Sequence, residues 1–408
     1  MTTSSAPLAG VKVLELSSMY AAPTCGRMLR DFGADVVKVE DPVSGDFARQ
    51  WSPFKNGLSL GFSRLNSGKR SLGIDLRQPE GRELVRRMAA DVDVVIESFR
   101  PGRLEAWGLG YEELSADNPG LVLTRVSGFG QTGPYSPKPG FGTVAETASG
   151  YAYINGWPDT PPTSPPFGFA DSIAGISAAF GTSMALFNRS RTGRGDVVDV
   201  ALYEPLMFIL GDIVLRWTGN GEVQERVGNG TGSASPRGIF RTRDDRWISI
   251  AASAQNIAVR LFEAMERPDI IEDPKYATNA ARMENNDEMQ AIVSAWVAEH
   301  DRDELLALLD EHDVVSAAVN DAHDISEDPH FLERTLVALK DVPQLGQVLM
   351  PGPILHVDSY GGPEYVGVPE VGQHTVELLR ERLGLDDAEV ERLAQAGVIP
   401  ATAGPRQP

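Results

Sequence analysis

Short apolar runs alternate with amphipathic stretches along the first third of the chain. The apolar runs predict strands at 11–16, 34–39, 70–76, 94–97 and 121–126. The amphipathic stretches predict helices at 23–32 and 79–90, the second opened by a proline in its first turn. Strands that alternate with helices are typical of βαβ units. The pattern therefore predicts an α/β fold with a Rossmann-like parallel sheet.

Glycine and proline divide the rest of the chain. The segment 130–140 (GQTGPYSPKPG) predicts a long exposed loop, and apolar helices are expected at 143–154 and 171–188. A second loop at 228–236 precedes a strand at 247–251 and a helix-rich segment that ends near 312. We expect a large Rossmann-like domain over 1–220, a smaller domain over 221–325, and a C-terminal segment over 326–408 that returns to the large domain.

Composition narrows the class of protein. A chain of 408 residues with 42% hydrophobic residues can bury more than one core. The net charge of −20 argues against a nucleic-acid or anionic membrane partner. The longest weakly polar stretches, 174–187 and 206–215, fall short of the ~20 residues that a membrane helix needs. The single cysteine, Cys25, excludes an intrachain disulfide and a Cys-rich zinc site, and the cytoplasm is the expected location.

Several catalytic templates are missing from the sequence. The GFGQTG motif at 128–133 matches G-x-G-x-x-G, but Pro134, Pro137 and Pro139 exclude the helix that a dinucleotide site requires. G-x-S-x-G, phosphate-loop and H-E-x-x-H motifs do not occur. All six histidines lie at position 300 or later. Serine hydrolase, P-loop kinase and zinc protease chemistry therefore have little support.

A carboxylate is the best candidate for chemistry in the large domain. Asp171 lies in FGFADSIAG at the start of an apolar helix, where it fits two roles: a helix N-cap, or an oriented and ionised nucleophile. The sequence alone leaves both roles open. Basic residues outnumber acidic ones between Arg64 and Arg103, and those in loops could meet phosphates.

Seven blocks in order carry a family resemblance: GVKVLEL, FGADVVKVE, NSGKRSLGIDL, ESFRPGRLEAWGLGYEEL, SGFGQTGPY, FADSIAG and RTGRGDVVDVALYEP. Over about residues 8–400 the chain resembles the class III CoA-transferases, the CaiB–BaiF family. The SPRGIF and SAQNIAVRLFEAM blocks are most similar to the mesaconyl-CoA transferase branch.

The resemblance implies an enzyme that moves CoA between carboxylic acids through an aspartyl-CoA thioester. Its substrates would be acyl-CoA and carboxylic acids, with short dicarboxylic acyl groups, and it would use no metal and no cofactor beyond CoA as a substrate. It also implies an interlocked homodimer, in which each chain threads a hole in its partner.

The resemblance also assigns residues. Asp171 falls on the family's nucleophile, and Gly230 and Gly232 fall in the glycine-rich loop, 228–235, that closes over the site. Arg237 follows that loop, and its guanidinium is a candidate to receive a distal substrate carboxylate. The CoA-contact blocks fall on Met19, Tyr20, Ile74, Arg77, Ser98, Phe99, Arg100, Arg103, Trp107 and Lys138.

The chain departs from the family pattern at two positions. Asp41 stands where some members carry a basic residue, and Gly142 stands where formyl-CoA transferases have a glutamate; Glu146 is an alternative source of that acid. Two other functions stay open. A relative of α-methylacyl-CoA racemase would need a histidine within 128–150, where none occurs, and a non-catalytic acyl-CoA-binding protein would not need Asp171.

Overall fold

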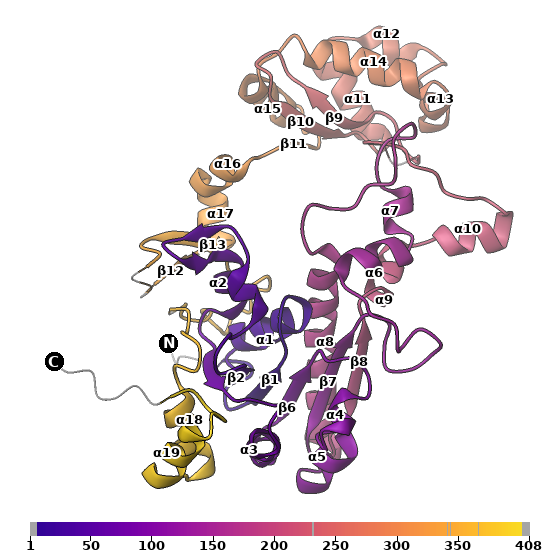
Figure 1. The fold of residues 1–408 in the computed structure, drawn as a ribbon. Helices are drawn as coiled ribbons and strands as arrows, with labels where there is room; N and C mark the ends of the chain where they lie inside the picture. The colour runs from indigo at the N-terminus through magenta and orange to yellow at the C-terminus, as the bar shows by residue number, and fades with distance from the viewer. Residues whose placement is uncertain (1–5, 231, 341, 343, 366, 402–408) are drawn as a thin grey trace. The chain divides into compact units, whose positions relative to one another are not determined.

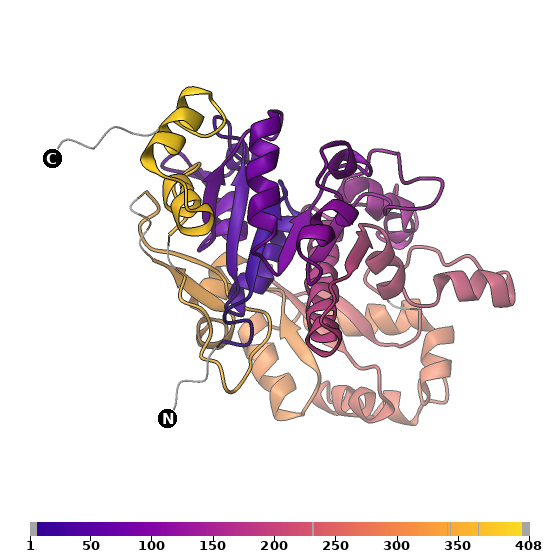
Figure 2. The ribbon, with the colours of Figure 1, turned by 90° about the horizontal axis from the view of Figure 1, so that it is seen from below.

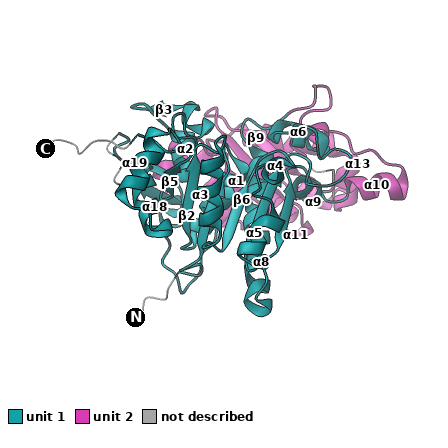
Figure 3. Ribbon diagram, turned by 60° about the horizontal axis from the view of Figure 1, so that its bottom comes forward, with its two compact units in different colours: residues 1–151, 164–212, 329–408 teal, residues 152–163, 213–328 magenta. Residues whose placement is uncertain are grey.

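The computed structural model describes residues 6–401 except 231, 341, 343 and 366. These residues form two compact units, shown in Figure 3. Unit 1 comprises Met1–Tyr151, Ser164–Asp212 and Pro329–Pro408, and unit 2 comprises Ala152–Thr163 and Ile213–Asp328.

The centre of unit 1 is a six-stranded sheet in the order β5-β2-β1-β6-β7-β8 (Figure 1). Every neighbouring pair in it is parallel, and β1 pairs with both β2 and β6. This is the strand order of a doubly wound Rossmann fold, in which the order reverses between the two strands at the centre. The expected α/β fold with a parallel sheet is confirmed.

The first part of unit 1 alternates strands with helices. Its elements are β1 (Lys12–Leu16), α1 (Ala21–Asp31), β2 (Asp35–Glu40), the 3₁₀ turn η1 (Phe47–Gln50), β3 (Phe54–Lys55), β4 (Leu58–Ser59), α2 (Leu60–Asn66), β5 (Arg70–Gly73), α3 (Pro79–Ala89), β6 (Val94–Glu97), α4 (Arg103–Ala106), α5 (Tyr111–Asp117), β7 (Val122–Ser127), α6 (Gly142–Ala148), α8 (Phe169–Thr192), β8 (Val197–Ala201) and α9 (Glu204–Ile209).

Both faces of the sheet are buried. Leu14 belongs to one apolar core, with residues of α3, and its neighbour Val13 belongs to the other, with residues of α1 and α8. Successive strand residues point to opposite faces, so a sheet covered on both sides has apolar residues at consecutive positions. Gly175 allows α8 to approach α1, because a Cβ there would lie 2.5 Å from the carbonyl oxygen of Ala21.

The C-terminal segment packs against the β5 edge of this sheet (Figures 1 and 2). The backbone N–H of His374 donates to the carbonyl of Ser71 at 3.0 Å, and the N–H of Gly73 donates to Thr375 Oγ1 at 2.9 Å. The segment contains α17 (Pro329–Arg334), β12 (Leu336–Leu339), β13 (Val348–Pro351), α18 (Thr375–Leu383) and α19 (Asp387–Gln395).

Unit 2 is built on a three-stranded antiparallel sheet in the order β11-β10-β9. Ile248 and Ile250 of β10 are fully buried against the helices. The elements that lie largely or wholly in this unit are α7 (Tyr151–Ile154), α10 (Ile213–Asn220), β9 (Arg237–Arg241), β10 (Trp247–Ala251), α11 (Gln255–Ala264), α12 (Pro268–Glu272), α13 (Asn279–Glu284), α14 (Asn286–Val297), α15 (Arg302–Glu311), β11 (Ser316–Ala318) and α16 (Ala322–Glu327).

Three expected elements differ from the structure. The strand expected at 70–76 ends at Gly73, because the chain then turns and the N–H of Asp75 bonds to Val398 in the C-terminal segment. The helix expected at 143–154 is two helices, α6 and α7, separated by Gly150 at φ +93°. The helix expected at 171–188 extends over 24 residues as α8.

Within the described residues, α8 is the one helix whose length and composition would allow it to cross a membrane. The apolar stretch noted in the sequence, 174–187, lies inside this helix, and the residues on either side of it extend the helix to 24 residues. Ala170, Ala174 and Ala178 are fully buried in the core that α8 shares with α1. A core helix passes the same test, so this is weak evidence for a membrane span.

Candidate active site

Two adjoining cavities lie in unit 1 where the strand order reverses, at the carboxyl ends of β1 and β6. The first, of about 190 Å³, is lined by the turns that follow these strands, by the 136–141 loop and by Asp171. The second, of about 260 Å³, extends toward the ends of β2 and β5. Ser18, Ser98 and Phe99 line both cavities. Ligands of doubly wound sheets bind at this position.

Asp171 lies in the first turn of α8, and its carboxyl group faces the first cavity. The N-cap residue of α8 is Gly168 and no side chain caps the helix, so the N-cap interpretation of Asp171 is wrong. The helix N-terminus favours the ionised carboxylate. Burial opposes this, and together with the charge of Glu146 it raises the pKa of Asp171 to about 6.

Glu146 is the acidic neighbour of Asp171. It lies on α6, is almost fully buried, and accepts a hydrogen bond from the backbone N–H of Ala170 at 3.3 Å. Its side chain thus approaches Asp171 from α6. A carboxyl group thus lies near Asp171 one helical turn after Gly142 on the same helix, and its role stays a prediction.

The rate should depend on pH through this pair. A carboxylate acts as a nucleophile only when ionised, so with Asp171 in the role implied by the family resemblance we expect kcat/KM to rise through its pKa of about 6 and to level off about one unit above it. Glu146→Gln removes the neighbouring negative charge, one of the two causes of the raised Asp171 pKa, so the rise in kcat/KM should move to lower pH. Burial remains, so the pKa of Asp171 should stay above the range of an ordinary aspartate. The measurement is the pH profile of kcat/KM for both proteins. Identical profiles would contradict the coupling.

The Asp171 carboxylate leaves no room for a side chain at position 142. An added Cβ would lie 2.3 Å from Asp171 Oδ2, closer than two such atoms can approach. Gly168 is the next closest glycine, and its Cβ would lie 3.2 Å from the same oxygen. Glycine at 142 thus leaves room for the Asp171 carboxylate.

Gly142→Ala should lower kcat by about 10²-fold, because it displaces the nucleophile by a fraction of an ångström or more. Steady-state kinetics and a thermal melt would separate this effect from unfolding. Gly61→Ala is the matched control, since its added Cβ would make only ordinary contacts, at 3.7 Å or beyond, and should leave kcat within about twofold. Equal activity of the two variants would refute the steric argument.

Buried charges hold the turn after β1. The N–H of Met19, a residue with φ +74°, donates to Asp46 Oδ1 at 3.1 Å. Lys38 Nζ forms ion pairs with Asp46 at 2.7 Å and with Glu15 at 2.8 Å, and donates to the carbonyl of Ser17 at 2.7 Å. Lys69 pairs with the other oxygen of Glu15 at 2.8 Å. The network fixes the Met19 backbone in a left-handed conformation that non-glycine residues rarely adopt.

A second network holds the turn after β6. Glu97 Oε2 accepts the N–H of Phe99 at 2.7 Å, while its Oε1 accepts from Arg125 Nε at 2.7 Å. Arg125 Nη1 also donates to Glu105 of α4 at 2.7 Å. This arrangement ties β6, β7 and α4 together around the residues that line both cavities.

The structure brings most of the expected CoA-contact residues of unit 1 to these cavities. The first cavity is lined by Met19, Tyr20, Ser98, Phe99, Arg100, Lys138 and Asp171. The second is lined by Ile74, Arg77, Ser98, Phe99 and Trp107. Arg103 lines neither cavity, but its guanidinium lies over the Trp107 ring at 5.4 Å from the centroid.

Arg77 is already paired in this structure. Its Nε donates to Asp75 at 2.7 Å and its Nη2 to Asp41 at 3.0 Å, although the side chain is 72% exposed. Asp41, the position where some relatives carry a basic residue, thus neutralises an arginine at the second cavity. A phosphate that binds Arg77 must compete with both carboxylates.

Gly230, Gly232 and Arg237 belong to unit 2, so their place at the site stays a prediction. Gly230 is partly buried, whereas Gly232 and Arg237 are exposed. Thr231, between the two glycines, lies outside the described residues.

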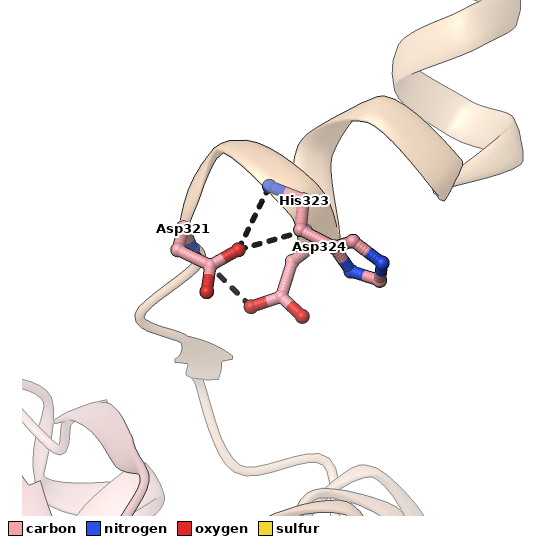
Figure 4. Close-up of side chains that lie close together, drawn as sticks. All are labelled: Asp321, His323 and Asp324. Atoms are coloured by element: carbon pink, nitrogen blue, oxygen red, sulfur yellow. Dashed lines mark hydrogen bonds between the residues drawn. The ribbon is translucent and has the colours of Figure 1, made fainter.

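A polar cluster in unit 2 is a helix cap rather than a cation site (Figure 4). Asp321 accepts the N–H groups of His323 and Asp324, and Asp324 accepts the N–H of Asp321 in return. Arg246 donates to Asp324 at 2.6 Å and Arg302 donates to it at 3.1 Å. Arg246, the backbone of Asp321 and Arg302 lower the pKa of Asp324 to about 2. Two guanidinium groups beside these carboxylates disfavour a metal ion.

Sequence reasoning missed the residues that support the site, chiefly Lys38, Asp46, Glu97 and Arg125. A signal was present, since Glu15 and Lys38 interrupt the apolar strands LEL and VKV. A charge inside a strand that is buried on both faces needs a partner. Its partner is distant in sequence, so the pairing itself emerges only from the fold.

A carboxylate in a cavity at the switch point of a doubly wound sheet is typical of an α/β enzyme. The chain belongs to CoA-transferase family III, whose family model matches residues 8–375. Succinyl-CoA–D-citramalate CoA-transferase of Chloroflexus aurantiacus is 41% identical over 96% of this chain and 98% of its own length. Succinyl-CoA:glutarate CoA-transferase of Mus musculus is 33% identical over 96% and 90%.

Among solved structures, a CAIB/BAIF family protein from Brucella suis superposes with a TM-score of 0.83 and 32% identity, over 93% of this chain and 100% of its own. The resemblance seen in the sequence is confirmed, and the protein is a CoA-transferase, for which CoA is a substrate.

Proposed function

We propose that this enzyme moves CoA between short dicarboxylic acids through an aspartyl-CoA thioester on Asp171. The observation that carries the proposal is the placement of the Asp171 carboxylate in the first cavity, with its pKa raised by burial and by Glu146. The names of the two relatives support the substrate class, since succinate, citramalate and glutarate are all dicarboxylic acids.

The reaction begins when a carboxylate oxygen of Asp171 attacks the thioester carbonyl. The C–S bond breaks, CoA leaves as a thiolate, and a mixed anhydride remains. The thiolate then attacks the Asp171 carbonyl, which releases the donor acid and leaves an aspartyl-CoA thioester. An acceptor carboxylate then attacks this thioester, the thiolate leaves, and a second mixed anhydride forms between Asp171 and the acceptor. The thiolate attacks the acceptor carbonyl of this anhydride, which gives the new acyl-CoA and restores the Asp171 carboxylate.

We assign the two parts of the acyl-CoA substrate to different cavities. The CoA handle would lie along the second cavity and past the turn after β6, where Arg100, Arg103 and Lys138 offer positive charge to phosphates. The acyl group would lie in the first cavity beside Asp171. The glycine-rich loop with Gly230 and Gly232 would close over it, provide backbone N–H donors for the oxyanion, and exclude water as a competing acceptor.

Two alternative functions have less support. A non-catalytic acyl-CoA-binding protein does not fit a chain that belongs to a family of CoA-transferases. None of the described residues that line either cavity is a histidine, so the proton transfer of a racemase-like enzyme lacks an imidazole there. A metal is not part of the proposal, since carboxylate attack on a thioester needs none.

Isotope exchange tests the reaction type. A CoA ester of an unsymmetrical dicarboxylic acid such as citramalate is supplied unlabelled, together with the isotope-labelled free acid, and the CoA ester is isolated. Label in the ester means intermolecular transfer, as the proposal expects with an external acceptor. Isomerised ester without label means transfer within one molecule. Hydrolysis to free acid and CoA, with neither product, would contradict a transferase.

We further propose that the protein is an interlocked homodimer in the cytoplasm. Large apolar side chains are exposed on two helices of unit 1. Phe180 of α8 is 67% exposed and Phe208 of α9 is 88% exposed. Such patches mark interaction surfaces. The buried Cys25 thiol, whose pKa burial raises to about 12, suits a reducing compartment.

Interlocking predicts a dimer that does not dissociate on dilution. Mass photometry at nanomolar concentration should show one species of twice the chain mass of 44.1 kDa. Folded monomers at that concentration would contradict it.

A further inference from the structure

Arg64 contacts Tyr20, a residue that lines the first cavity together with Asp171. Its guanidinium donates to the Tyr20 hydroxyl and lies 5.0 Å from the centroid of that ring. The same hydroxyl is hydrogen-bonded to Ser172 Oγ at 3.2 Å, and Ser172 directly follows Asp171. Tyr20 itself lines the first cavity. A chain of two hydrogen bonds therefore runs from Arg64 to the residue next to the nucleophile.

Arg64 also lacks a counter-charge. It is partly buried, yet it makes no ion pair with any carboxylate in the described part of the chain. Comparable arginines of unit 1 are paired: Arg27 with Asp31 at 2.7 Å, and Arg49 with Glu40 at 2.8 Å. A partly buried guanidinium without a carboxylate costs free energy that an anionic ligand would offset.

Space for a ligand carboxylate is available beside it. Arg64, Ser172 and Thr24 line a third cavity of about 120 Å³, together with Asp31, whose carboxylate is paired with Arg27 at 2.7 Å. Tyr20, which lines the first cavity, is hydrogen-bonded to both Arg64 and Ser172. Since water occupies about 30 Å³, the cavity can hold a carboxylate group and its attached methylene.

We infer that Arg64, with the Tyr20 hydroxyl, receives the distal carboxylate of the dicarboxylic acyl group and so selects dicarboxylic substrates. The inference rests on the proposed function and names the substrate-selecting residue of that site. A guanidinium binds a carboxylate with two parallel hydrogen bonds, and the phenol hydroxyl can add a third. Arg100 and Lys138 line the first cavity with Asp171 but are exposed in the loops assigned to the CoA handle, and Arg237 lies in unit 2. Arg64 is the partly buried cation that contacts Tyr20 at the edge of that cavity.

The test is a ratio of specificity constants for two donors, succinyl-CoA and butyryl-CoA, which differ in the distal carboxylate. Arg64→Gln should lower the succinyl-to-butyryl ratio of kcat/KM by about 10²-fold. The reason is that only succinyl-CoA has a distal carboxylate, so only this substrate loses a charge-assisted pair with the guanidinium. Arg64→Lys keeps the charge without the two parallel bonds and should lower the ratio by about 10-fold. Arg100→Gln is the matched control: it should raise KM for both donors alike and leave the ratio unchanged.

An unchanged ratio in both Arg64 variants would overturn the inference, and so would an Arg237→Gln variant that alone lowers the ratio. A thermal melt checks that each variant is folded, and Arg64→Lys carries the test if Arg64→Gln is not. Intact-mass detection of the CoA adduct on the unmodified enzyme is run in parallel. An adduct with an unchanged ratio refutes only the role of Arg64, whereas the absence of any adduct refutes the proposed function.

Discussion

Asp171→Asn is expected to lower kcat by about 10⁴-fold, because the amide cannot form the anhydride or carry CoA. Glu146, the carboxylate beside it, is almost fully buried and lines neither of the two cavities, so it is not placed to replace Asp171. Cys25 is fully buried, and burial raises the pKa of its thiol to about 12. Ser172 Oγ donates to the Gly168 carbonyl at 2.8 Å and has no base beside it. KM for acyl-CoA should change little, since the CoA handle lies along other residues.

The measurement is steady-state CoA transfer from succinyl-CoA to a free dicarboxylic acid, together with binding of acyl-CoA to the variant. Asp159→Asn, an exposed carboxylate of unit 2, is the matched control and should retain the full rate. If Asp171→Asn transfers CoA as fast as the unmodified enzyme, the chain binds acyl-CoA without using Asp171 and the nucleophile must be sought elsewhere.

Lys38→Met is expected to have the largest effect on stability. Burial alone would lower the pKa of Lys38, but Glu15 and Asp46 raise it, so the ammonium stays charged inside the core. Methionine has a similar length and leaves these carboxylates buried with one cation fewer. Removing one partner of a buried charge network costs about 3–5 kcal/mol. The loss also frees the Asp46 side chain that holds Met19, so KM for acyl-CoA should rise.

Chemical unfolding followed by circular dichroism measures the first effect. Lys12→Met is the matched control, because Lys12 pairs with Asp91 at the surface, where both side chains are well exposed, and it should cost less than about 1 kcal/mol. Equal destabilisation by the two substitutions would contradict the account of the buried network.

Much of the fold follows from local pattern. The strands expected at 94–97 and 247–251 coincide with β6 and β10, because each is a short apolar run bounded by polar residues. Ends and breaks were less predictable. The strand at 70–76 stops early because a segment more than 300 residues away provides the next hydrogen-bond partner, and no local pattern contains that information.

The site was predictable in a different way. Asp171, Tyr20 and Lys138 were assigned through family blocks, and the fold places them around one cavity because they follow strand ends or begin a helix there. The residues that support them could not be paired from the sequence. Lys38 and Asp46 are a strand residue and a loop residue whose contact depends on the curvature of the chain after β2. Likewise, the need for glycine at 142 arises only from the position of the Asp171 carboxylate.

The most direct test of the central claim is the mass of the enzyme after brief incubation with succinyl-CoA, followed by peptide mapping. The account predicts a covalent CoA adduct, lost on treatment with hydroxylamine or borohydride, that maps to Asp171 and is absent from Asp171→Asn. An adduct on any other residue, or active turnover with no covalent species on Asp171, would contradict it.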